Sequence, residues 1–250
     1  MSEPRLSIVI PAYNEALRIG DSLEKVRHYI ESKPFPVELL VVDDGSTDPT
    51  VEIVSKALAA FPSGRLVRND RNHGKGFSVR HGVLEARGEL VLFTDSDLST
   101  PIEEADKLLE SIETSGADAA IGSRALQREL IGVRQPWFRE WAGRGFNLLV
   151  RVLTGLPFRD TQCGFKLFRR ATARRAFELQ RIEGFGFDPE ILFLMERLGG
   201  HVVEIPVRWN DNPASKVRFL SDATRMFADL IALRWRALTG QYPIETSSKA

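Results

Sequence analysis

Short apolar runs rich in branched residues alternate with segments of helical spacing through the first half of the chain. Runs that are apolar at successive positions are typical of strands buried on both faces, and strands that alternate with helices indicate a mostly parallel sheet. We therefore predict an α/β fold with helices on both faces of the sheet. The expected strands cover Leu6–Ile10, Val37–Val42, Leu66–Arg68, Leu90–Thr94 and Ala119–Gly122.

Helical spacing and start signals place helices between these strands, over 17–30, 49–60, 76–86 and 101–115. Asp48 is the expected N-cap of the second helix, with Pro49 at its first position, and Ser99 or Thr100 is the expected cap of the fourth. Ligands of such sheets bind beyond the carboxyl ends of the strands. The polar clusters that follow three strands therefore predict a site, and they are Asn14–Glu15, Asp43–Asp44 and Asp95–Asp97.

After Arg124 this alternation changes. We expect helices over 137–153, 188–198 and 217–238, a strand over 202–209, and a compact polar and aromatic segment at 160–168. The sequence contains no clear linker and no internal repeat. We therefore treat residues 1–250 as a single domain with two continuous halves, 1–122 and 123–250.

The net charge is zero, with 34 Lys and Arg against 34 Asp and Glu, so the total charge indicates no polyanionic partner. We expect no nucleic acid partner. Cys163 is the only cysteine, which excludes an intrachain disulfide and fits a reducing compartment. The first residues lack the apolar run of a signal peptide, and no stretch approaches the about 20 apolar residues of a membrane-spanning helix. We expect a cytoplasmic protein.

The acidic turn Asp95-Ser96-Asp97 is the strongest local signal for chemistry. An apolar strand delivers two carboxylates, two positions apart, to the edge of the sheet. Two such groups can hold a hard divalent cation and leave positions for phosphate oxygens and water. Carboxylates also cap helices and turns, but the expected caps nearby are Ser99 or Thr100. We therefore predict that Asp95 and Asp97 bind a metal.

Asp43 and Asp44 follow another expected strand, and their carboxylates are suited to accept hydrogen bonds from a nucleobase or ribose. The alternative is an Asx-type turn before a capped helix. Lys75 lies between two glycines at a predicted helix start, where backbone N–H groups and its ammonium favour a phosphate. A flexible turn is the alternative there, because the spacing does not match a P-loop.

The stretch from Arg124 to Arg181 is basic, with thirteen Arg or Lys against four Asp or Glu. Such an excess favours an anionic ligand or surface, whereas a single basic residue usually belongs to a solvated face. The four histidines show no metal-ligand spacing, and the Gly-x-Ser-x-Gly motif of many hydrolases is missing. Cys163 is expected to be a small buried residue, not a nucleophile.

Three segments together resemble the family 2 inverting glycosyltransferases, namely Ile8–Glu15, Val41–Asp48 and Thr94–Asp97. The resemblance covers nearly the whole chain and implies the single-domain GT-A fold, a Rossmann-like sheet with helices on both faces. It implies that residues 1–122 are the nucleotide-sugar-binding half and residues 123–250 the acceptor half, which ends in an amphipathic helix. It also implies Mg²⁺ or Mn²⁺ as the cofactor.

Within that family the chain is most similar to the dolichyl-phosphate β-glucosyltransferases. The matching segments are Asn72–Gly76, Ile121–Arg124, Arg159–Phe168, Phe187–Glu190 and Ser215–Lys216. Polyprenyl-phosphate mannosyltransferases share these motifs, so a GDP-mannose-dependent enzyme is the alternative. Many of them have Gln two residues after the second Asp of the acidic turn, where this chain has Ser99. We therefore favour UDP-glucose as the donor.

The resemblance implies donor-side roles for the matching residues. Asp95 and Asp97 would hold the metal and the diphosphate, and Ser96 between them would contribute backbone contacts. The nucleoside pocket would be lined by Pro11, Ala12, Tyr13, Glu15, Asp43 and Asp44.

On the acceptor side, Arg124 and Lys216 would bind phosphate charge, and Gln162 and Asp188 would lie near the sugar. The expected reaction is a single in-line displacement that inverts the anomeric carbon. A polyprenyl phosphate is already anionic near neutral pH, so it needs positioning by cations more than a general base. Asp188 is the candidate base if the acceptor is a hydroxyl.

A lipid acceptor predicts peripheral contact with a membrane, at its cytoplasmic face. Two predicted helices have apolar and basic residues suited to an interface, although such stripes usually pack into a core. The alternatives to a lipid acceptor are a soluble acceptor or a catalytically silent nucleotide-sugar-binding module. The interfacial residues are Trp137, Phe138, Trp141 and Phe146 with Arg139 and Arg144, then Phe219, Leu220, Ala223, Met226, Phe227, Leu230 and Ile231.

Overall fold

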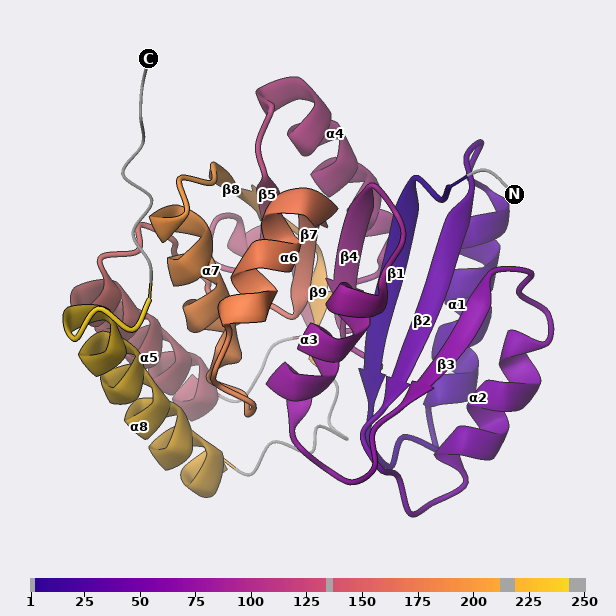
Figure 1. Ribbon diagram of the computed structural model, residues 1–250, viewed down its shortest axis with the longest axis horizontal. Helices are drawn as coiled ribbons and strands as arrows, with labels where there is room; N and C mark the ends of the chain where they lie inside the picture. Colours follow the sequence, from indigo (N-terminus) through magenta and orange to yellow (C-terminus); the bar gives the residue numbers. More distant parts are fainter. Residues whose placement is uncertain (1–2, 134–136, 212–218, 243–250) are drawn as a thin grey trace.

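A single seven-stranded sheet organises the molecule (Figure 1). The computed structural model describes residues 3–133, 137–211 and 219–242. The strand order is β3-β2-β1-β4-β7-β5-β8, and only β7 runs antiparallel to its neighbours within this sheet. The strands are β1 (Leu6–Ala12), β2 (Val37–Asp43), β3 (Gly64–Arg68), β4 (Leu90–Thr94), β5 (Ala119–Ser123), β7 (Phe165–Arg169) and β8 (Val202–Pro206). The predicted mostly parallel α/β sheet is confirmed.

Helices cover both faces of the sheet, and each face has its own apolar core. On one face lie α1 (Ile19–Glu31), α2 (Thr50–Leu58) and α4 (Ala105–Ser115), which follows the short 3₁₀ helix Ile102–Glu104. On the other lie α3 (Lys75–Glu85), α6 (Arg170–Leu179) and α7 (Phe187–Arg197). Two longer helices, α5 (Trp137–Thr154) and α8 (Phe219–Leu238), pack together beside α7, at the end away from β3 (Figure 1).

The strand sequences explain this layering. Ile8 and Ile10 of β1 point into one core and Val9 between them into the other, and all three are fully buried. Side chains of a strand alternate between faces, so a run without polar positions requires cover on both sides. Burial of each such side chain stabilises the fold by about 1.5–3 kcal/mol.

Two helix-start predictions are wrong. Pro49, and not Asp48, is the N-cap of α2, while Asp48 accepts hydrogen bonds from the backbone N–H groups of Thr50 (3.0 Å) and Ala16 (3.2 Å). Neither Ser99 nor Thr100 caps the helix after the acidic turn. Pro101 holds that position and makes no side-chain cap.

Other differences concern the second half. β7, α6 and the small strand β6 (Ile131–Val133) were not predicted. The strand expected over 202–209 divides into β8 and β9 (Trp209–Asn210), and β9 pairs with β6. Strands from both halves join the one sheet. Within the part of the chain that the structure describes, no helix is both long and apolar enough to cross a membrane.

Candidate active site

The loops after β1 and β2 are hydrogen-bonded to each other at the carboxyl edge of the sheet. The side-chain Oδ1 of Asn14 accepts from the backbone N–H of Thr47 (2.8 Å), and the backbone N–H of Asn14 donates to Ser46 Oγ (2.9 Å). Asn14 has a positive φ of 54°, a conformation that Asn tolerates better than most residues. These bonds fix the geometry of two of the three predicted polar clusters.

Asp43 and Asp44 both serve the turns around them. Asp43 is fully buried and accepts from the backbone N–H of Ser46, at 3.3 Å to each carboxylate oxygen. Asp44 accepts from the Asn69 side chain (2.7 Å) and from the backbone N–H of His73 (3.1 Å) and Gly74 (2.8 Å). The turn role, which was the alternative to binding a nucleobase or ribose, is therefore present for both aspartates. Asp44 also positions the loop that leads into α3.

The acidic turn lies directly after β4, as predicted. The backbone N–H of Asp95 donates to the Gly164 carbonyl (3.2 Å), which joins the turn to the segment before β7. Asp97 Oδ1 accepts from the backbone N–H of Ser99 (3.0 Å). The side chains of Asp95 and Asp97 are 35% and 15% exposed, so both remain open to a ligand. Ser96 between them is buried.

Each carboxylate of the acidic turn has a basic partner. Lys75 Nζ lies 2.6 Å from Asp95 Oδ1, and Arg18 Nη1 lies 3.5 Å from Asp97 Oδ2. Burial and the charge of Asp95 raise the pKa of Asp97, and Arg18 acts against that rise. Burial alone would lower the pKa of Lys75, but the nearby charges of Asp95 and Asp188 outweigh it and raise the pKa. Lys75 therefore stays a cation.

The pair Asp95 and Asp97 fits a hard divalent cation. Their carboxylates repel each other, and a shared cation relieves that repulsion. Within residues 3–133, 137–211 and 219–242 no three His, Cys, Asp or Glu side chains form a metal cluster. A metal here would keep coordination positions for diphosphate oxygens and water, as Mg²⁺ sites commonly do.

Beneath this turn, Lys166 and Asp188 form a buried ion pair, with side chains 1% and 3% exposed. Lys166 is in β7, points to the α3 and α7 side of the sheet, and also donates to the Cys163 carbonyl (2.5 Å). Asp188 lies in the first turn of α7. Burial raises the pKa of Asp188, although both Lys166 and Lys75 oppose this. The ammonium of Lys75 thus interacts electrostatically with both Asp95 and Asp188.

Arg124, predicted to bind phosphate, pairs with Asp160. Its Nε and Nη2 lie 2.7 and 2.8 Å from the two oxygens of that carboxylate, and its guanidinium lies 5.4 Å from the Trp209 ring centre. Although burial acts to raise the pKa of Asp160, Arg124 lowers it. Cys163 is buried, and burial raises the pKa of its thiol to about 11, so it is the small neutral residue expected.

The remaining predicted donor residues lie at the same edge. Pro11 and Ala12 end β1, Tyr13 is 39% exposed, and Glu15 is 7% exposed. Lys216 lies outside the described residues, as do Ser215 and the start of the predicted last helix.

Three residues of the site were not predicted: Arg18, Gly164 and Lys166. Arg18 follows the Asn14-Glu15 cluster by only a few residues, so its position was a usable signal. Lys166 stands in the apolar run Phe165–Phe168, where a lysine indicates a buried partner. Gly164 leaves room for Asp95, since a Cβ there would lie 2.0 Å from Asp95 Oδ2.

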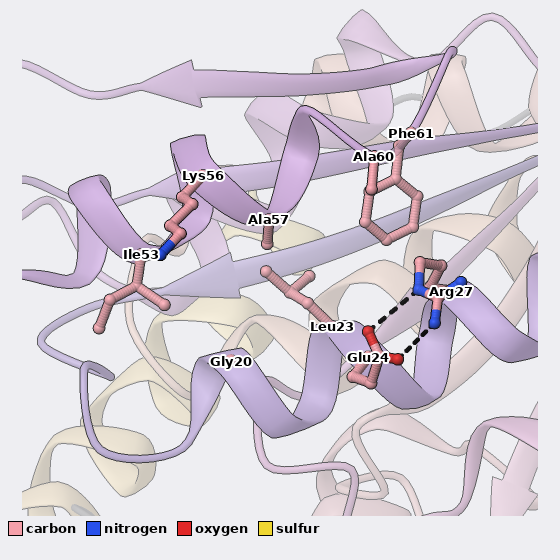
Figure 2. A pocket seen from close by; sticks show the side chains of 9 residues that line it. All are labelled: Gly20, Leu23, Glu24, Arg27, Ile53, Lys56, Ala57, Ala60 and Phe61. Atoms are coloured by element: carbon pink, nitrogen blue, oxygen red, sulfur yellow. Dashed lines mark hydrogen bonds and ion pairs between the residues drawn. The ribbon is translucent and has the colours of Figure 1, made fainter.

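A separate hollow between α1 and α2 is lined mainly by apolar side chains (Figure 2). Its polar lining includes the ion pair of Arg27 with Glu24 and the side chain of Lys56. None of the acidic-turn residues lines it. The carboxyl edge of the sheet is therefore the better candidate for chemistry.

Comparison with known proteins identifies the family of the chain. A family model described as glycosyl transferase family 2 matches residues 7–177, which include the three loops described above. The chain belongs to glycosyl transferase family 2. This glycosyltransferase is 38% identical over 247 residues to a dolichyl-phosphate beta-glucosyltransferase of Trichomonas vaginalis, covering 94% of this chain and 73% of that protein. It is 36% identical over 259 residues to the one of Mus musculus, covering 98% and 80%. The predicted family and enzyme class are confirmed.

A solved structure supports the fold of the glycosyltransferase. Glucosyl-3-phosphoglycerate synthase from Mycobacterium tuberculosis, in complex with Mn²⁺, UDP and glucosyl-3-phosphoglycerate, matches with a TM-score of 0.67 at 21% identity. The match covers 98% of this chain and 82% of that one. The predicted GT-A fold is confirmed.

Proposed function

We propose that the enzyme transfers a hexose, with inversion, from a nucleotide sugar to a polyprenyl phosphate, and that UDP-glucose and dolichyl phosphate or a similar lipid are its substrates. The likeness to proteins named dolichyl-phosphate beta-glucosyltransferase, over 94% to 98% of the chain, carries the proposal. The acidic turn and its basic partners supply a matching site for a diphosphate.

On the donor side, the β1 and β2 loops would hold the nucleoside. Tyr13 has exposed surface for it, and Pro11, Ala12, Glu15, Asp43 and Asp44 complete the proposed pocket. When bound to Asp95 and Asp97, Mg²⁺ or Mn²⁺ would neutralise the charge that grows on the leaving diphosphate. Lys75 adds a fixed positive charge beside the same group.

On the acceptor side, the state of Asp188 favours a phosphate over a hydroxyl. A general base must reach the proton that it removes, but the carboxylate of Asp188 is 3% exposed and bound to Lys166. A phosphate acceptor needs no such base. In this proposal Asp188 holds Lys166 and Lys75 in place, while Arg124 and Lys216 provide the positive charge that lets two anions approach.

A lipid acceptor also requires access from a membrane, and the paired helices α5 and α8 offer a surface. Their exposed apolar residues recur at helical spacing, and Arg144 and Arg234 are exposed nearby. Apolar side chains flanked by arginine suit the boundary of an anionic bilayer. We place the enzyme peripherally at the cytoplasmic face. The exposed apolar residues are Trp141, Leu148 and Val152 on α5, and Phe227, Ile231, Trp235 and Leu238 on α8.

This surface differs partly from the predicted one. Leu230 is buried and Phe146 is half-buried against the core, so core packing is the correct interpretation for both. Trp141, Phe227 and Ile231 are exposed as an interface requires.

The decisive experiment offers the enzyme two donors and two acceptors. Radiolabelled UDP-glucose and GDP-mannose are each incubated with dolichyl phosphate or with 3-phosphoglycerate, in Mn²⁺, in Mg²⁺ and in EDTA. We expect label in the lipid only from UDP-glucose and only with metal. Lipid labelling from GDP-mannose would make the enzyme a mannosyltransferase. Labelling of 3-phosphoglycerate alone would reject the lipid acceptor.

An Asp97→Asn variant tests whether transfer depends on the acidic turn, because the change removes one charge and keeps the size of the side chain. We expect its transfer to fall by about 100-fold or more, which fits the loss of one metal-held contact in the transition state. Nucleotide-sugar binding without any turnover in the unmodified enzyme would instead indicate a silent binding module.

A further inference from the structure

Arg18 is a charged residue beside the acidic turn that belongs neither to the proposed nucleoside pocket nor to the proposed metal ligands. It stands between the β1 loop and α1, and its side chain is 19% exposed. Its Nε and Nη2 both donate to the carboxylate of Glu15, with Nη2 at 2.9 Å from Oε1. This two-point contact fixes the plane of the guanidinium.

The third nitrogen of that guanidinium is directed toward the acidic turn. Nη1 lies 3.5 Å from Asp97 Oδ2, is buried, and has no hydrogen-bond partner among the described residues. A buried N–H without a partner is costly, because it has lost its bonds to water. Such an atom beside a ligand site indicates that the ligand supplies the missing acceptor.

We propose that Arg18 binds the diphosphate of the nucleotide sugar through Nη1 and that Glu15 is the residue that positions it. The inference rests on the proposed function, because it assumes a nucleotide-sugar donor. A planar guanidinium matches the oxygens of a phosphate better than most side chains do. Lys75 approaches the acidic turn from α3 and Arg18 from the β1 loop, so a diphosphate at Asp95 and Asp97 would have a cation from each element.

The test measures ligand binding, so that it does not depend on turnover. Calorimetric titration gives the Kd of UDP, GDP, uridine and guanosine, each in Mn²⁺ and in EDTA. The variants are Arg18→Met, Arg18→Lys and the control Arg27→Met, which removes an arginine of α1 that pairs with Glu24 and Glu31 of the same helix. Thermal melting shows whether each variant is folded.

We expect Arg18→Met to weaken binding of the preferred diphosphate by about ten-fold or more, with and without Mn²⁺, and to leave nucleoside binding unchanged. The Kd of Arg18→Lys should lie between those of Arg18→Met and the wild type, because lysine keeps the charge but not the planar set of N–H donors. If Arg18→Met does not fold, the Kd of Arg18→Lys provides the test.

Other results overturn the inference. Equal losses for diphosphate and nucleoside would show that Arg18 only holds the loop, and a loss confined to Mn²⁺ would show that it acts through Asp97. Unchanged Kd values would show no role in binding. A wild-type enzyme that binds neither UDP nor GDP would reject the proposed function and this inference together, whereas normal wild-type binding with no effect of Arg18 would reject the inference alone.

Discussion

Lys75 Nζ lies 2.6 Å from Asp95 Oδ1, so the carboxylate expected to bind a metal is already paired with an ammonium of the same chain. The ammonium also lies 5.3 Å from the centre of the Phe93 ring and faces the charge of Asp188. Before any ligand binds, the site is therefore partly neutralised. A metal must compete with Lys75 for Asp95, and it competes better when a diphosphate brings further negative charge.

Replacing Lys75 by Met should strengthen the binding of Mn²⁺ alone by roughly ten-fold, because no ammonium then competes for Asp95. Hexose transfer should fall, since the diphosphate loses a positive neighbour. Electron paramagnetic resonance of free Mn²⁺ gives the affinity. Lys56→Met on the exposed side of α2 is the matched control. Weaker Mn²⁺ binding in the Lys75 variant would show that Lys75 does not compete with the metal.

Gly164 should not tolerate a methyl group. A Cβ there would lie 2.0 Å from Asp95 Oδ2 and 2.5 Å from its Cγ, so Gly164→Ala must displace the carboxylate. We expect Mn²⁺-dependent UDP binding to weaken and the free energy of unfolding to fall by about 1–3 kcal/mol, which calorimetry and urea titration measure. Gly143→Ala, where a Cβ meets nothing within 4 Å, should do neither. Normal metal-dependent binding in Gly164→Ala would contradict the close packing.

The sequence allowed the position of the polar clusters at the carboxyl edge to be predicted, because their pattern is local. The apolar strands β1, β2 and β4 each end where a polar cluster begins, and because these strands are parallel the clusters meet at one edge. The position of Asp95 and Asp97 could be predicted without knowledge of distant contacts. Their position after Leu90–Thr94 determined where they lie in the fold.

The centre of the sheet could not be predicted in the same way. β7 pairs with β4 and β5, both far earlier in the chain, and its Lys166 interrupts the apolar pattern of a buried strand. The reason for that lysine is Asp188, a partner 22 residues away that only the folded chain brings near. Similarly, Asp48 was expected to cap α2, but Pro49 holds that position and Asp48 binds the Ala16 backbone across two loops.

The buried pair of Lys166 and Asp188 should dominate the stability of this region. Asp188→Ala leaves an ammonium that is 1% exposed without its carboxylate, at a cost of about 3–5 kcal/mol. Asp188→Ala combined with Lys166→Met should be less destabilising than Asp188→Ala alone, because no charge then remains unpaired. Urea unfolding of the wild type, of Asp188→Ala, of Lys166→Met and of the double variant measures both effects. Additive losses would mean that the pair does not interact strongly.

Glu190 gives stability a dependence on pH. It is buried, accepts from the backbone N–H of Ile182 (2.8 Å) and from the Tyr242 hydroxyl, and burial raises its pKa above 4.5. The folded chain thus holds this proton more tightly than the unfolded chain does. The contribution of Glu190 to stability is complete below pH 4.5 and is lost as the pH rises through the folded pKa.

In Glu190→Gln that dependence should disappear. The melting temperature of the wild type, relative to this variant, should decrease between about pH 4.5 and neutrality. Melting curves at a series of pH values test it, with Glu178→Gln on the exposed side of α6 as the control. If the melting temperature of the wild type instead rises relative to that of Glu190→Gln with increasing pH, the hydrogen bonds to Glu190 lower its pKa by more than burial raises it.

The exposed apolar residues of α5 and α8 should govern attachment to a membrane. Trp141 and Trp235 are 66% and 65% exposed, and each such side chain gains about 1.5–3 kcal/mol when an apolar phase covers it. The double change Trp141→Glu and Trp235→Glu should therefore reduce binding to anionic phospholipid vesicles by at least about ten-fold in a sedimentation assay. Ala59→Glu combined with Ala60→Glu on the far side, after the end of α2, controls for the two added charges. The Kd for UDP should stay unchanged, because the donor loops lie at the sheet edge and not on these helices.

Transfer to dolichyl phosphate in vesicles should fall in the double tryptophan variant, while transfer to a short, water-soluble polyprenyl phosphate should persist. Loss of both activities together would mean that the two tryptophans support the fold, and that another surface reaches the lipid.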